Sequence, residues 1–186
     1  TERAIQQLLA ERGTGHVETQ LVTAPSQGLG LAADARAMQS PETYIGYGQA
    51  TNFASSTAPL LDRLQRYSAP AALPLNHWAL TGAWTLGREF ASSNDAPAGI
   101  VYRFHARDLH LVLGPSRDGK PVKFRISIDG APPGDAHGSD VAADGTGVVT
   151  QQRLYQLVRQ SGKIVDRTFS IEFDEPGVDA YVFTFG

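Results

Sequence analysis

The stretch that decides the fold is VKFRISIDG, residues 122–130. From Val122 to Ile128 every second side chain is apolar, and the side chains between them are polar or charged. Successive side chains of a β-strand point to opposite faces, so this period of two predicts a strand with one face in a core and the other in solvent. The Asp129–Gly130 pair that follows favours a tight turn.

The same alternation recurs through the second half of the chain. RTFSIEFDEPG at 167–177 repeats it, and VDAYVFTFG at 178–186 places Tyr181, Phe183 and Phe185 on one side. Gly-containing turn pairs separate the runs at 118–119, 129–130, 144–145, 161–162 and 176–177. Short alternating strands with such turns are typical of an all-β fold, and we expect an antiparallel β-sandwich with a jelly-roll or an immunoglobulin-like topology.

One strand pair is predicted from its register. If Arg107–Asp108 forms a two-residue loop, the flanking strands make a hairpin in which His105 lies opposite His110. Phe104 then lies opposite Leu111 on the apolar face of the pair. The two histidines project from the other face.

The composition excludes several classes of function. The 186 residues carry 16 basic and 19 acidic side chains without a basic run, so the electrostatic footprint of a nucleic-acid-binding protein is missing. No apolar run is long enough to span a bilayer, and no signal peptide opens the chain. There is no cysteine, which excludes a disulfide framework, a thiolate metal site and a redox dithiol within this chain.

The first part of the chain has a different pattern. TERAIQQLLAERG at 1–13 has apolar residues at helical spacing and Gly13 in a C-cap position, which predicts one short helix. Because the chain opens inside this helix, we expect a fragment of a longer protein. Residues 14–42 mix small, polar, Gly and Pro residues and predict a linker, and residues 43–186 are the predicted β-sandwich domain.

LPLNHWALTGAW at 73–84 holds both tryptophans of the chain. Trp78 and Trp84 share strand parity and would lie roughly 20 Å apart on an extended strand, too far for one sugar ring to touch both. Small residues alternate with them, so burial in the core is the favoured interpretation for both rings. A role in stacking on a sugar is kept for Trp78 alone, where Asn76 and His77 would add polar contacts.

Two other groups of residues contain possible metal ligands. His105 and His110 would lie together beside Arg103, but a zinc site requires a third protein ligand and the guanidinium would oppose a cation, so a hydrogen-bonded histidine pair is favoured. In GDAHGSD at 134–140, a turn held by aspartate side chains is favoured over a calcium site. The chain also has no nucleophile elbow and no carboxylate pair in an apolar setting. We therefore expect no metal, no cofactor and no catalytic site.

Five motifs in order carry a resemblance to a known family. They are LNHWALTGAWTLGRE at 75–89, YRFHARDLHLVLGP at 102–115, FRISIDGAPPGDAHGSDV at 124–141, RLYQLVRQ at 153–160 and PGVDAYVFTFG at 176–186. Over about residues 40–186 the sequence resembles the C-terminal part of DipZ-type proteins. These are bacterial membrane proteins in which a CcdA-like membrane domain precedes a thioredoxin-like domain and a carbohydrate-binding-module-like sandwich. The helix at 1–13 resembles the last helix of the thioredoxin-like domain.

The resemblance implies a non-catalytic accessory module of an extracytoplasmic, membrane-tethered thiol–disulfide exchange protein. The redox cysteines of the family lie in the thioredoxin-like domain, and no position of this chain matches them. The expected partners are the parent's own thioredoxin-like and membrane domains, together with a glycan or a client protein.

Two functions remain open for the module. The first is carbohydrate binding through polar and aromatic residues, and the candidates are Asn76, His77, Trp78, Arg103, His105, His110 and Tyr155. The second is docking on the thioredoxin-like neighbour or a client without binding sugar. An exposed aromatic ring at the rim would favour the first, whereas two buried tryptophans with an apolar patch elsewhere would favour the second.

Overall fold

The computed structural model describes residue 34 and residues 38–115 and 118–186. The helix predicted at 1–13 and most of the linker predicted at 14–42 lie outside these residues. The regular structure of the described part is β-strand, apart from one 3-10 turn at Gly134–Ala136. The all-β prediction is therefore confirmed. The strands are β1 (Thr43–Tyr44), β2 (Leu64–Tyr67), β3 (Trp78–Leu86), β4 (Ala91–Ser93), β5 (Ala98–Phe104), β6 (Asp108–Gly114), β7 (Val122–Ile128), β8 (Thr146–Val149), β9 (Arg153–Arg159), β10 (Arg167–Phe173) and β11 (Asp179–Phe185).

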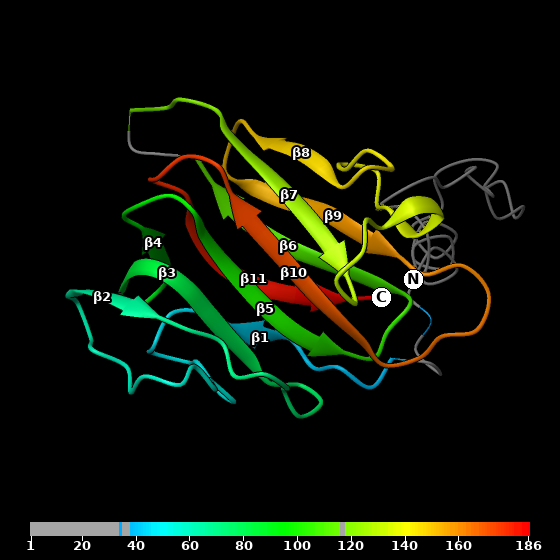
Figure 1. Ribbon diagram of the computed structural model, residues 1–186, viewed down its shortest axis with the longest axis horizontal. Helices are drawn as coiled ribbons and strands as arrows, with labels where there is room; N and C mark the ends of the chain where they lie inside the picture. Colours follow the sequence, from blue (N-terminus) through cyan, green and yellow to red (C-terminus); the bar gives the residue numbers. More distant parts are fainter. Residues whose placement is uncertain (1–33, 35–37, 116–117) are drawn as a thin grey trace, which may run out of the picture. The chain divides into compact units, whose positions relative to one another are not determined.

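The strands form two antiparallel layers. Sheet 1 has the order β8-β7-β10-β5-β3, and sheet 2 continues as β3-β4-β11-β6-β9, with β2 beside β3 and β1 beside β11. Figure 1 shows β7, β10 and β5 in front of β9, β6 and β11. The domain is thus a sandwich whose two sheets have one strand in common.

The shared strand is β3, and it changes sheets at Gly82. Trp78–Thr81 pairs with β5, whereas Trp84–Leu86 pairs with β4. Gly82 has a φ of 81°, and a Cβ atom there would lie 2.5 Å from the carbonyl oxygen of Pro97. Only glycine combines this backbone conformation with so close an approach, so the corner of the sandwich depends on it.

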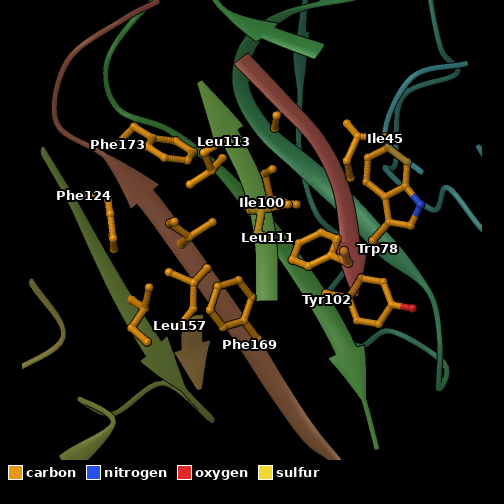
Figure 2. Close-up of a cluster of buried hydrophobic side chains, with 14 of the residues drawn as sticks. Ile45, Trp78, Ile100, Tyr102, Leu111, Leu113, Phe124, Leu157, Phe169 and Phe173 are labelled. Atoms are coloured by element: carbon orange, nitrogen blue, oxygen red, sulfur yellow. The ribbon is translucent and has the colours of Figure 1, made fainter. Parts of the chain in front are cut away.

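The alternating stretches line the core, as their pattern predicts. The apolar residues of β7 and β10 are buried and face Leu111, Leu113 and Leu157 of sheet 2 (Figure 2). Trp78 and Trp84 have no exposed surface, which agrees with the interpretation that both belong to the core. The turn after β7 also forms as expected, because Asp129 and Gly130 both have positive φ, 52° and 80°.

The predicted hairpin at Arg107–Asp108 is wrong. β5 pairs with β10 and β3, while β6 pairs with β11 and β9, so the chain crosses from one sheet to the other between them. Phe104 and Leu111 are both buried, as expected, but they come from opposite sheets. Alternation predicts only that both side chains are buried, and a side chain can be buried against the facing sheet as well as beside a neighbouring strand. The Arg–Asp pair also lacks the preference for positive φ that a two-residue hairpin loop requires.

The last strand also departs from simple alternation. A β-bulge lies between Ala180 and Val182, which pair with the consecutive residues Leu113 and Val112. Tyr181 is the extra residue, and the alternation predicted with Phe183 and Phe185 is therefore wrong for it. A bulge turns the strand locally and re-aims the side chain of the inserted residue.

A buried carboxylate holds the start of β6. Asp108 is almost fully buried, and its two oxygens accept hydrogen bonds from Arg107 (2.9 and 2.6 Å) and Arg159 (2.6 Å). Burial by itself would raise the pKa of Asp108, but the hydrogen bonds from Arg159 and Arg107 outweigh it, and the pKa lies below its ordinary value. The carboxylate thus ties β6 to the end of β9.

The Gly82→Ala variant tests the shared strand. We expect it to lower the free energy of unfolding by about 3 kcal/mol, from left-handed strain and overlap with backbone atoms. Gly130→Ala is the matched control, because Gly130 has nearly the same φ but nothing within 4 Å of the added methyl. It should cost about 1 kcal/mol, from strain alone. Urea unfolding measures both, and equal losses would contradict the close approach at Gly82.

The Asp108→Asn variant tests the buried carboxylate. We expect a loss of about 3 kcal/mol at neutral pH, because two partly buried guanidinium groups lose their counter-ion. A depressed pKa in the folded state means that the stabilisation is present above the ordinary aspartate pKa, near 3.8, and is lost as the pH falls through the folded-state value. The difference between wild type and variant should therefore shrink below about pH 4. Asp135→Asn, at an exposed position, should show no such difference.

Candidate functional site

The first three candidates lie where the chain enters β3. Trp78 is buried, and its indole N–H donates to the carbonyl of Thr51 at 2.9 Å. The ring centroid of Phe53 lies 4.8 Å from the Trp78 ring. His77 has Nδ1 at 3.0 Å from the carbonyl oxygen of Leu75, and Asn76 is left-handed with a φ of 63°. As the domain stands, Trp78 offers no open ring face for a sugar to stack on.

Asn76, Arg103 and His105 are brought together around Ser40. The Ser40 hydroxyl donates to Asn76 Oδ1 at 2.7 Å and accepts the backbone N–H of His105 at 2.8 Å. His105 Nδ1 lies 2.6 Å from Asp166, whose second oxygen accepts from Arg103 at 3.3 Å. The hydrogen bond with His105 is the main cause that lowers the pKa of Asp166. This cluster fastens the residues before β1 to the end of β5.

His110 and Tyr155 lie in sheet 2, on β6 and β9, away from that cluster. His110 Nδ1 is 3.4 Å from the Thr184 hydroxyl, and burial lowers the pKa of the imidazole. Tyr155 is fully buried, with its hydroxyl donating to the carbonyl of Gln151 at 2.9 Å. The seven candidates therefore do not form one cluster, and two of them, Trp78 and Tyr155, are buried rings.

The sequence interpretation missed Ser40 and Asp166. Neither follows an alternating strand, so no periodic signal placed them beside His105. In the loop at 134–140, Asp140 pairs with Arg153 at 2.6 Å and accepts the backbone N–H of Gln156. Within the part of the chain that the structure describes, no three His, Cys, Asp or Glu side chains are grouped as a metal would require.

An open pocket of about 550 Å³ lies on the outer face of sheet 2, and we call it the outer-face pocket. Its base is formed by Val112 of β6 and by the bulged part of β11. Tyr44, at the end of β1, and the turn between β3 and β4 form its sides. Its lining residues are Tyr44, Gly46, Gly48, Gln49, Arg88, Glu89, Val112, Tyr181 and Val182.

Backbone contacts fix the walls of the outer-face pocket. The N–H groups of Tyr47 and Gly48 donate to the carbonyls of Gly87 and Arg88, at 3.0 and 2.9 Å. A Cβ atom on Gly46 would lie 2.2 Å from the backbone of Glu89, so the two segments touch there. The ring of Tyr181 is held by Phe90, with 5.0 Å between centroids. The pocket is therefore built from fixed backbone with exposed polar side chains on its rim.

A second, apolar pocket of about 280 Å³ lies beside β2. It is lined by Tyr47, Ala50, Phe53, Pro59, Leu61, Trp78 and Leu86. Leu61 is one of three exposed leucines close together in the sequence. Leu60, Leu61 and Leu64 have exposed fractions of 41%, 46% and 60%, and we call them the leucine patch. Most exposed leucines stand singly, so three within five residues beside an apolar pocket indicate a contact surface.

Comparison with known proteins gives consistent matches. Residues 40–186 match the sequence model of a family described as the thioredoxin like C-terminal domain. Protein DipZ from Mycobacterium bovis and Protein DipZ from Mycobacterium tuberculosis are each 32% identical to this chain over 133 residues. The alignment covers 68% of this chain and 18% of each relative, so the chain spans less than a fifth of their length. The resemblance predicted from the five motifs is confirmed. None of the described residues forms a helix with the length and hydropathy needed to cross a membrane.

Acrylamide quenching of tryptophan fluorescence tests the burial of the two rings. Because Trp78 and Trp84 are both inaccessible, we expect the native chain to be quenched several-fold less than the chain unfolded in guanidinium. Trp78→Phe should remove part of the emission and leave the remaining emission equally protected. A readily quenched component in the native chain would contradict the buried position of one ring.

Proposed function

Because the chain belongs to the family of thioredoxin-like C-terminal domains, we propose that it is the accessory domain of an extracytoplasmic, membrane-tethered thiol–disulfide exchange protein. Its likeness to the two DipZ proteins, which are several times longer, supports this parentage. The chain has no cysteine, so it supplies no thiol for the exchange. In this proposal the redox chemistry belongs to a thioredoxin-like domain that precedes residues 43–186, and the sandwich works by binding.

Docking onto a protein neighbour is the binding function that the geometry supports best. The observation that carries it is the leucine patch, of which Leu61 also lines an apolar pocket together with Phe53 and Pro59. The buried core of a protein interface is more apolar than the rest of the surface, and an exposed apolar patch on a single domain often marks such a site. Both tryptophans are buried, so neither ring is available as a platform for stacking on a sugar.

The occupant we propose is the thioredoxin-like domain of the same protein. More than four fifths of each relative lies outside the region that matches this chain, so the parent has ample further structure to cover the patch. A tethered neighbour needs little contact area, because the link gives it a high effective concentration. A client protein is the other occupant, and the experiment separates the two.

Carbohydrate binding is the second candidate function. The seven residues proposed from the sequence do not form one surface for a sugar. Trp78 and Tyr155 are buried, and His110 lies in the other sheet from Arg103. The observation that favours it is the outer-face pocket, where two tyrosines and several polar side chains line an open cavity.

A photo-crosslinking residue in place of Leu61, in the intact parent protein, tests the docking proposal. We expect a crosslink to the thioredoxin-like domain. Leu64→Lys should reduce its yield tenfold or more, because an unpaired charge in an apolar interface costs more than about 1.4 kcal/mol.

The control places the same crosslinker at Val148, an exposed apolar residue on β8 of sheet 1. It should give no crosslink to that domain, and Val148→Lys should leave the Leu61 yield unchanged. Crosslinks from Leu61 to separate client proteins only, or none at all, would contradict docking within the parent.

A further inference from the structure

We propose that the outer-face pocket binds a neutral saccharide residue, with Tyr44 and Tyr181 in contact with the ring and Gln49, Arg88 and Glu89 bonded to its hydroxyls. This inference goes beyond docking and rests on the second candidate function. It moves that function from the residues around Trp78 to a different surface of the domain.

The first observation is the bulge in β11. Regular alternation would turn Tyr181 towards the core with Phe183, but the extra residue places it in the lining of the pocket beside Val182. An inserted residue interrupts the ladder with the neighbouring strand β6, while the Tyr181 carbonyl accepts the backbone N–H of Ile45 at 2.8 Å on the other side. Here the insertion brings a large amphipathic ring to the pocket, where Phe90 packs against it and where Tyr44, paired with Val182, also belongs to the lining. Rigid tyrosines offer contact area at a low cost in conformational entropy.

The second observation is that the polar side chains of the pocket are not engaged with one another. Other charged side chains of the domain are already paired and so are not available to a ligand, as in Arg103 with Asp166 and Arg153 with Asp140. In the described part of the chain, the side chains of Gln49, Arg88 and Glu89 make no such hydrogen bond or ion pair. Their amide, guanidinium and carboxylate groups line one cavity and are available for hydrogen bonds to a ligand.

The charge of the pocket selects the ligand class. Arg88 and Glu89 are neighbours of opposite sign, so the lining itself carries no net charge, and the Glu42 carboxylate beside the Tyr44 hydroxyl disfavours an anion. A guanidinium and an amide donate, while a carboxylate accepts, which together suit hydroxyl groups that do both. The tyrosine rings suit the apolar C–H faces of a sugar ring. A neutral saccharide satisfies all of these groups at once.

The shape of the pocket fits one ring of a longer glycan. A volume of about 550 Å³ is within the range for small-molecule sites. The pocket is open to solvent, so neighbouring sugar residues can continue out of it. The backbone walls at Gly46, Gly87 and Arg88 are already fixed, and binding therefore does not require the site to be ordered first.

Nuclear magnetic resonance titration of the whole 186-residue chain tests the proposal, with cellotriose, mannotriose and triacetylchitotriose as probes. We expect one of them to shift the amide signals around Gly46, Arg88 and Val182. Tyr181→Ala should weaken binding of that sugar about tenfold or more, and Arg88→Ala or Gln49→Ala about threefold to tenfold. The last two side chains are exposed, so these variants keep the fold when Tyr181→Ala does not.

The control variant is Leu64→Lys, on the leucine patch. It should leave the affinity for the sugar unchanged, whereas the docking crosslink is lost, and this distinguishes a failure of either proposal from a failure of the other. Absence of shifts with all three sugars overturns the saccharide site. So does binding that Arg88→Ala and Gln49→Ala leave intact. A preference for trigalacturonic acid over the neutral sugars overturns the assignment of a neutral ligand.

Discussion

The crossing of β3 from one sheet to the other at Gly82 is the constraint on which the rest of the domain depends. Since both sheets share this strand, its bend sets the angle between them and closes one side of the sandwich. The bend also allows Trp78 and Trp84 to enter the core from different sheets, with their indole N–H groups satisfied by nearby carbonyls. A methyl group at residue 82 would meet the backbone at Pro97, so the corner tolerates no other side chain.

The same strand leads directly to both candidate surfaces. Its far end turns at Arg88 and Glu89 into β4 and so forms one side of the outer-face pocket, while Leu86 lines the apolar pocket. β2, whose first residue Leu64 belongs to the leucine patch, pairs with β3 across the bend, from Gly82 to Thr85. The positions of both surfaces therefore depend on β3, the strand that the two sheets share.

The fold can be predicted from the sequence where only one arrangement buries the apolar side chains, and it cannot be predicted where two arrangements bury them equally well. The period of two in β7 and β10 is enough to predict both strands and their buried faces, because a shift of one residue would turn the polar side chains into the core. The pairing of β5 with β6 was wrong because Phe104 and Leu111 bury equally well beside or across from each other. Tyr181 could not be placed, since a bulge has no signature in the residues around it. Asp166 reaches His105 through a loop of 7 residues between β9 and β10, and loop paths leave no periodic pattern.

The two pockets share one short segment, residues 46–50, as part of their lining. Gly46, Gly48 and Gln49 line the outer-face pocket, and Tyr47 and Ala50 line the apolar one. Hydrogen bonds to Gly87 and Arg88 hold this wall from one side, and the Tyr47 hydroxyl donates to Asp62 at 2.8 Å on the other. A ligand can influence a second site only through an element that has two arrangements of similar energy. Hydrogen bonds on both sides favour a single arrangement of this wall, so we expect the two proposed ligands, a protein neighbour at the leucine patch and a sugar in the outer-face pocket, to bind independently of each other.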